Sequence, residues 1–130
     1  MNNDLKRPTG IQLHTRSREL ELTYAGGERF HLGCEYLRVY SPSAEVKGHG
    51  PGQEVLQTGK LNVAITAIRP IGNYALQLVF DDGHDTGLYS WEYLYQLGAE
   101  QPSRWQDYLA RVHKSGAQRD PEVQVVKLDL

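Results

Sequence analysis

One short turn holds most of the side chains of this chain that could do chemistry: Asp81, Asp82, His84 and Asp85. An imidazole beside carboxylates could bind a divalent metal ion, so His84, Asp82 and Asp85 are candidate metal ligands. Iron in non-haem sites takes two histidines and one carboxylate, and a second histidine would have to come from His49 or His31. The residue types therefore allow an iron site without completing one locally.

The same residues also suit a simple turn that leads into a helix. Asp-Gly pairs such as Asp82-Gly83 are typical of tight turns. Asp and Thr side chains accept hydrogen bonds from the free N–H groups at helix N-termini, so Asp85 or Thr86 could cap the helix that carries Trp91. A metal site and a capped turn both remain open on these residues.

Composition limits the classes of function. The 130 residues fit one domain. With 14 basic and 16 acidic residues, the chain has no excess of positive charge that would favour binding to nucleic acid. Cys34 is the single cysteine, which excludes an internal disulfide and suits a small core residue better than a nucleophile. No leader or membrane-spanning run is evident, so we expect a soluble, cytoplasmic protein without membrane partners.

Apolar and polar residues alternate, as in half-buried strands, over the segments 11–15, 20–24, 29–32, 63–67 and 74–80. Gly26-Gly27 predicts a hairpin turn between the second and third of these segments. In the last one, Tyr74, Leu76, Leu78 and Phe80 are expected to share one face.

Helical spacing predicts three helices. The first covers 34–40 and ends before Pro42, and the second carries Trp91 to Gly98. The third has Ser103 as its predicted cap and Gln106 in a capping box, with an apolar face from Trp105 to Val112. Residues 44–60 are rich in glycine and are expected to form a long flexible loop.

This order of elements predicts an α+β fold, in which two to three helices pack on one side of an antiparallel-rich sheet. We expect residues 1–10 to be a flexible N-terminus and 11–115 to form the single domain. Residues 116–130 would be a loose tail, or would contain a late strand from Val123 to Leu128.

Two longer patterns carry a family resemblance. They are the run from Leu37 to Val46 with Gly48-His49, and Gly72-Asn73-Tyr74-Ala75. With the opening stretch, they resemble the DUF971 family, also called the γ-butyrobetaine hydroxylase-like N-terminal domain. The resemblance covers roughly residues 10 to 98.

The resemblance implies a small domain that, in the hydroxylases, precedes a separate iron-dependent catalytic domain and binds zinc through three cysteines and a histidine. On this chain the cysteine positions fall at Ser41, Ser43 and Val46, and the histidine at His84. Two hydroxyls and a valine do not replace thiolates, so we expect the zinc site to be lost. The resemblance also implies a role beside iron or iron–sulfur cluster assembly.

Without a catalytic domain, a cofactor motif or an evident nucleophile with its base, we do not expect an enzyme. The leading interpretation is a non-catalytic accessory or adaptor domain that binds a protein partner through its connections. The candidate surface consists of Ser41, Ser43, Glu45, His49, Asp81, Tyr89 and Tyr93. The alternative is a metal-binding protein that uses His84 with nearby carboxylates; no cofactor is firmly implied, and iron is favoured over zinc.

Overall fold

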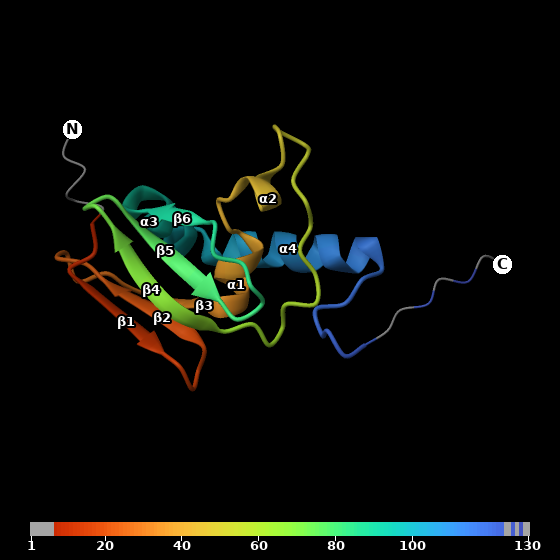
Figure 1. Ribbon diagram of the computed structural model, residues 1–130, viewed down its shortest axis with the longest axis horizontal. Coiled ribbons are helices and arrows are strands. Elements are labelled where there is room, and N and C mark those ends of the chain that lie inside the picture. The colour runs from red at the N-terminus through yellow and green to blue at the C-terminus, as the bar shows by residue number, and fades with distance from the viewer. Residues whose placement is uncertain (1–6, 124–125, 127, 129–130) are drawn as a thin grey trace.

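The computed structural model describes residues 7–123, 126 and 128. Its strands are β1 (Gly10–His14), β2 (Glu19–Thr23), β3 (Arg29–Gly33), β4 (Ile65–Ile71), β5 (Ala75–Phe80) and β6 (Leu88–Ser90). Its helices are α1 (Cys34–Val39), α2 (Ala44–Lys47), α3 (Trp91–Ala99) and α4 (Gln101–Ser115). Figure 1 shows the strands at one end of the molecule and α4 extending away from them. The predicted α+β class with antiparallel strands is confirmed, but the strands form two sheets.

The first sheet has the order β1-β2-β3, and both pairs are antiparallel. Leu20 and Leu22 on β2 are fully buried, and Glu19 and Glu21 alternate with them toward the other face. The predicted hairpin between β2 and β3 is confirmed. This sheet forms because period-two alternation places every second side chain on the core face.

The second sheet has the order β4-β5-β6, again antiparallel. Leu76, Leu78 and Phe80 share the buried face as predicted. Tyr74 does not, because it lies in the turn before β5 and is 57% exposed. The strand β6 was not predicted: its short run gives too weak an alternation signal, and it pairs with one neighbour only.

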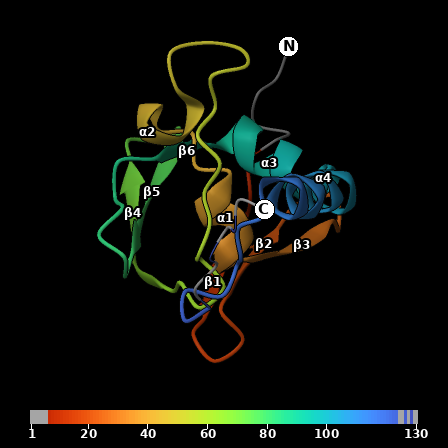
Figure 2. The ribbon, with the colours of Figure 1, turned by 90° about the vertical axis from the view of Figure 1, so that its right-hand side faces the viewer.

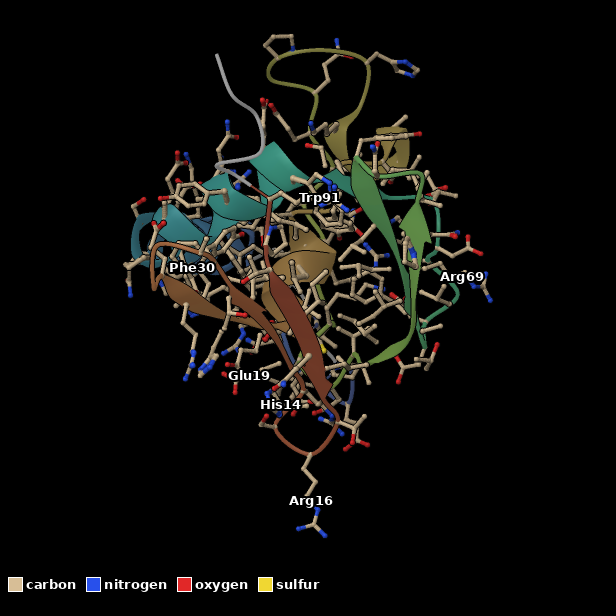
Figure 3. The ribbon with its side chains drawn as sticks, turned by 90° about the vertical axis from the view of Figure 1, so that its left-hand side faces the viewer. His14, Arg16, Glu19, Phe30, Arg69 and Trp91 are labelled. Carbon is tan, nitrogen blue, oxygen red and sulfur yellow. The ribbon has the colours of Figure 1, made fainter. Side chains whose placement is uncertain are left out.

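The helix α1 lies between the two sheets, as Figure 2 shows, and all its residues are buried. Cys34 and Leu37 belong to the main core, and burial raises the pKa of the Cys34 thiol. The interpretation of Cys34 as a core residue is therefore confirmed. Figure 3 shows side chains filling the space between the sheets, with Arg16 at the β1–β2 turn and Arg69 on β4 pointing outward.

The segment after α1 is only partly the flexible loop that its glycines predict. Ala44–Lys47 forms the helical turn α2, and Val46 on it is buried. The backbone N–H of Val55 then donates to the carbonyl of Val46 at 2.8 Å, which ties the returning chain to α2. Figure 1 shows this return as a long arm that passes α4.

The predicted caps of the last two helices are wrong. Ser90 caps α3, because its Oγ accepts from the N–H of Tyr93 at 3.1 Å, so neither Asp85 nor Thr86 has that role. The helix α4 begins at Gln101, and no side chain caps it. Ser103 lies inside the first turn and donates to the carbonyl of Glu100.

The start of the C-terminal segment is anchored, which corrects the expectation of a loose tail from residue 116. The carbonyls of Gln118 and Arg119 accept from the N–H groups of Gly59 and Leu61. Arg119 also donates two hydrogen bonds to the Glu35 carboxylate, at 2.7 and 2.8 Å. Half of the alternative late strand, and most of the expected flexible N-terminus, lie outside the described residues.

Among the described residues, no helix has both the length and the apolar character needed to cross a membrane.

Candidate functional site

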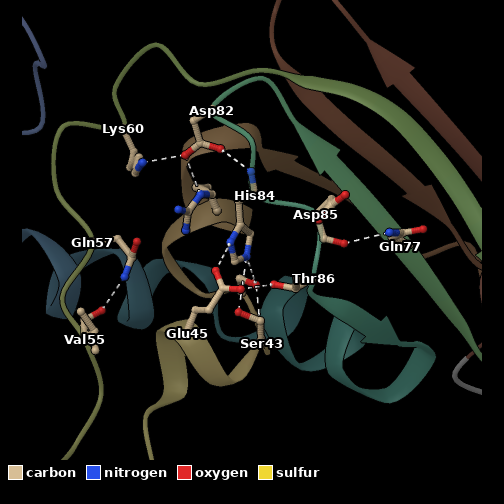
Figure 4. Close-up of polar contacts among 12 residues, drawn as sticks. Ser43, Glu45, Val55, Gln57, Lys60, Gln77, Asp82, His84, Asp85 and Thr86 are labelled. Carbon is tan, nitrogen blue, oxygen red and sulfur yellow. Dashed lines mark hydrogen bonds and ion pairs between the residues drawn. The ribbon is translucent and has the colours of Figure 1, made fainter.

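Two connections far apart in the sequence meet at the side chain of His84. One is the turn after β5 that the sequence singled out, and the other joins α1 to α2. His84 Nε2 lies 2.8 Å from Ser41 Oγ and 3.5 Å from Ser43 Oγ. On the other side of the ring, Nδ1 lies 3.3 Å from the Glu45 carboxylate, as Figure 4 shows.

The Glu45 carboxylate is held from a second direction, because Thr86 Oγ1 donates to it at 3.0 Å. Glu45 belongs to α2 and Thr86 to the turn, so these contacts fasten α2 to the turn. Thr86 does not cap a helix; it holds a carboxylate. We call the contacts among Ser41, Ser43, Glu45, His84 and Thr86 the His84 network.

Burial and the nearby Arg38 lower the pKa of His84, and the carboxylate of Glu45 opposes that shift. The ring is therefore neutral at pH 7. A hydroxyl, a neutral imidazole and a carboxylate in line are also the parts of an activated nucleophile. Ser41, however, is 1% exposed, and a Cβ on Gly87 would overlap Ser41 Oγ, so little room exists for a substrate. The His84 network therefore suits a structural link between α2 and the turn better than a reactive serine.

The Asp82 carboxylate faces cations instead of the imidazole. Its Oδ2 accepts from Lys60 Nζ at 2.6 Å and from Arg38 Nε at 2.8 Å, and its Oδ1 accepts from the N–H of His84. Burial alone would raise the pKa of Asp82, but these hydrogen bonds outweigh it and lower the pKa to about 2. Arg38 is 7% exposed, so Asp82 supplies the negative charge that pairs with this buried guanidinium.

The three candidate metal ligands do not converge in this arrangement. The ring of His84 faces Glu45, Asp82 faces Arg38 and Lys60, and Asp85 is exposed, with its backbone carbonyl accepting from Gln77. Throughout the described part of the chain, no group of three or more His, Cys, Asp or Glu side chains is arranged to hold a metal ion.

Nor does His31 complete a site at His84. It lies on β3 beside Glu21, with its Nε2 3.6 Å from the carboxylate, and His14 Nε2 is 2.7 Å from the same oxygen. Arg29 contacts the other oxygen of Glu21 at 3.2 Å. This cluster lies on the first sheet, so His31 contacts Glu21 there and is not a neighbour of His84.

Three of the four positions that the resemblance assigns to zinc ligands come together. Ser41 and Ser43 both lie beside His84, and Val46 is buried on α2 nearby in the sequence. The donors at these positions are one imidazole nitrogen and two neutral hydroxyls. Structural zinc takes four nitrogen or thiolate ligands, so these residues do not fit zinc.

The candidate surface divides into exposed and buried members. Glu45, His49 and Asp81 are exposed. Ser41, Ser43 and Tyr89 were predicted wrongly as surface residues: they are 1%, 7% and 0% exposed. Tyr89 belongs to the main core, and its buried hydroxyl donates to the carbonyl of Leu37, which joins β6 to α1. Tyr93 is partly buried, and its hydroxyl donates to the carbonyl of Tyr40 at 2.6 Å.

A groove of about 900 Å³ lies beside the His84 network. One wall is α2 with the arm that follows it, and the other wall is formed by α3 and α4. Its apolar lining includes Val39, Val46, Val55 and Leu56, and its aromatic lining is Tyr40, Tyr93 and Tyr108. Its charged lining is Lys47, Glu54, Arg104, Asp107 and Arg111, with His49 beside them. Ser41 borders the groove, although its hydroxyl is taken by the His84 network.

Three cations contact Tyr40 and Tyr93 in the wall of this groove. Lys47 Nζ lies 5.1 Å from the centre of the Tyr93 ring. The Arg104 guanidinium lies 5.4 Å from the Tyr40 ring and 5.9 Å from the Tyr93 ring. Arg111 donates from Nη2 to the Tyr40 hydroxyl at 3.4 Å. Cations within about 6 Å of an aromatic face are attracted to it.

The sequence drew attention to His84 and Glu45 but missed the cations that accompany them. Arg38, Lys60 and Arg104 each contact a residue of a different element, so spacing along the chain gives no sign of their partners. One signal was present: Arg38 lies in a short helix of otherwise core-forming residues. A buried arginine needs a partner.

The fold and the site together define a small α+β domain with a fastened polar turn and a groove, and no evident catalytic centre among the described residues. Residues 11–95 match the family model described as "Gamma-butyrobetaine hydroxylase-like, N-terminal", and the chain belongs to that family. The resemblance inferred from the sequence is therefore confirmed. No protein of curated function matches the chain.

Several solved structures are similar. Two solution structures determined by NMR are 51% and 54% identical, with TM-scores of 0.80 and 0.76. The alignments cover 97% and 95% of this chain, and 99% and 93% of the other chains. A crystal structure from Acidithiobacillus ferrooxidans ATCC 23270, a DUF971 family protein of unknown function, is 37% identical, with a TM-score of 0.64. That alignment covers 76% of this chain and all of the other.

Proposed function

We propose that this domain is a non-catalytic accessory module that binds a protein partner with the surface made by α2, the arm after it and the turn at 81–86. One observation carries the proposal: the groove beside α2 is lined by tyrosine and arginine, which are enriched where proteins bind one another. The His84 network supports it, because the contacts of Glu45 with His84 and Thr86 hold α2 against the turn.

The resemblance drawn from the sequence implies a role beside iron or iron–sulfur cluster assembly, so the partner we propose handles iron or iron–sulfur clusters. A crosslinked pull-down from a lysate of the organism that encodes the chain tests the module itself. We expect a recurrent protein recovered with wild type. If repeated crosslinking recovers no specific protein, the binding module is the wrong interpretation.

A metal-binding protein centred on His84 is the alternative proposal, and it requires Asp82 to leave Arg38 and Lys60, or Asp85 to turn toward the ring. The observation in its favour is the neutral ring, because a neutral imidazole is the form that binds metals. Metal analysis of protein purified without a histidine tag tests it, together with melting in added Fe(II) or Zn(II). Stoichiometric iron and a raised Tm would support the alternative. Substoichiometric metal with an unmoved Tm would remove it.

A further inference from the structure

We propose that the groove binds an acidic segment of the partner protein, with a carboxylate beside the Tyr40–Tyr93 pair and an apolar side chain against Val39, Val46 and Leu56. This proposal rests on the proposed function and names the chemistry that the partner presents. It uses three features of the groove: its cations, its apolar wall and its content of tyrosine and arginine.

The charge of the groove favours an anion at one place. Lys47 contacts Tyr93, Arg111 contacts Tyr40, and Arg104 contacts both rings. Arg111 forms an ion pair with the Asp107 carboxylate at 3.1 Å, and Arg104 forms one with the Glu100 carboxylate at 2.9 Å. In both pairs the carboxylate contacts Nε, on the edge of the guanidinium. Lys47 is the cation whose described contact is an aromatic ring, so its charge is the one most open to a carboxylate.

Acidic residues limit where that anion binds. Glu54 and Asp107 also line the groove, so the charge is mixed along its length. A uniformly acidic ligand would meet Glu54 on the arm. A segment with one or two carboxylates next to an apolar residue matches the pattern better, because the cations and the apolar wall border the same groove.

The composition of the groove favours a peptide, although its size would also admit a small molecule. Volumes of about 300 to 1,000 Å³ are usual for ligand pockets, and about 900 Å³ lies near the top of that range. Tyrosine and arginine supply most of the binding free energy at many protein interfaces. The groove presents three tyrosines and two arginines in its wall.

Selection of random twelve-residue peptides displayed on phage against the full chain tests this inference. We expect the enriched peptides to carry an acidic residue within a few positions of an apolar one. A synthetic copy of the most enriched peptide is then titrated against wild type and Lys47→Glu. The expected loss of affinity for Lys47→Glu is roughly tenfold or more, because charge reversal turns an attraction into a repulsion.

Arg16→Glu is the matched control, since it makes the same change in charge at the tip of the β1–β2 turn, away from the groove (Figure 3). It should keep affinity within about twofold once screening by salt is included. No enrichment, enriched peptides without acidic residues, or equal losses for both variants would overturn the inference. Equal binding of acetate or inorganic phosphate at the same Kd would also overturn it, in favour of a small-anion site.

The two proposals fail in different ways. A partner that crosslinks to the turn at 81–86, and whose binding is unaffected by Lys47→Glu, would keep the module and remove the acidic-segment groove. Absence of any partner in the crosslinked pull-down would count against the module itself.

Discussion

At the scale of single residues, His84 and Asp82 have different structural roles in the turn. His84 is a buried neutral ring that connects the turn to α2, while Asp82 neutralises Arg38 and Lys60. Sequence reasoning found both residues, because a histidine among aspartates is conspicuous. It could not assign their roles, since the partners lie in other elements, and only folding decides which side of the turn each side chain faces.

Protonation of His84 should destabilise the fold. Its pKa is lowered from 6.5 in the native state, so below pH 6.5 the unfolded chain binds more protons and the free energy of unfolding falls with pH. The loss should begin near pH 6.5 and continue until the pH reaches the lowered pKa of His84 in the native state. Asp82, with a native pKa of about 2, loses its contribution only below about pH 4.

Urea unfolding of wild type and His84→Gln between pH 7 and pH 5 measures this slope. The variant should be less stable at pH 7 but should change less between the two pH values. Parallel curves for the two proteins would show that His84 does not titrate on unfolding.

Replacing Asp82 by Asn should destabilise the domain by leaving Arg38 without its anionic partner. Removing one partner of a buried ion pair costs roughly 3 to 5 kcal/mol. Because the Asp82 side chain is 21% exposed, we expect about 2 kcal/mol from chemical denaturation. The exposed Asp85→Asn is the control, and it should change the free energy of unfolding by less than about 0.5 kcal/mol. Similar losses in both variants would contradict the assigned role of Asp82.

At the scale of elements, the strands and helices with strong periodicity were predictable, and the short connections were not. Leu20 and Leu22 alternate with glutamates, so β2 could be read directly. The strand β6 and the helix α2 are short, and both depend on contacts from other segments, such as the bond between Val46 and Val55. Caps failed because Asp85, Thr86 and Ser90 all precede α3, whereas α4 begins two residues before Ser103.

The caps of α3 and α4 give a test at this scale. Ser90→Ala removes the acceptor for the N–H of Tyr93 and should cost about 1 kcal/mol. Ser103→Ala, which the sequence pattern marks as the cap of α4, should be nearly neutral, because Ser103 lies inside the helix and only donates to Glu100. Thermal or urea unfolding measures both. A larger loss for Ser103→Ala than for Ser90→Ala would restore the sequence-based assignment.

At the scale of the whole molecule, two long-range connections join segments that lie far apart in the sequence. The His84 network joins α2 to the turn after β5, and Arg119 joins the C-terminal segment to α1 through Glu35. Neither follows from local pattern, since Arg119 and Glu35 lie 84 positions apart. The fold class was predictable because it depends on the order of elements, whereas the groove depends on how the connections return.

Arg119→Ala should destabilise the domain. A hydrogen bond to a charged group contributes roughly 1.5 to 3 kcal/mol, and Arg119 is partly exposed, so we expect about 2 kcal/mol. The exposed Lys114→Ala on α4 is the control and should be close to neutral. Equal stability of Arg119→Ala and wild type would show that the C-terminal segment does not contribute to the fold.

Site-specific photocrosslinking tests the central claim most directly. The residue p-benzoylphenylalanine is placed at His49, in the groove wall, or at Arg16, at the distant turn, and the full chain is irradiated in cells of the organism that encodes it. We predict that position 49 captures one recurrent protein, that position 16 does not, and that adding Lys47→Glu abolishes the capture. Capture at both positions alike, or at neither, would contradict the account.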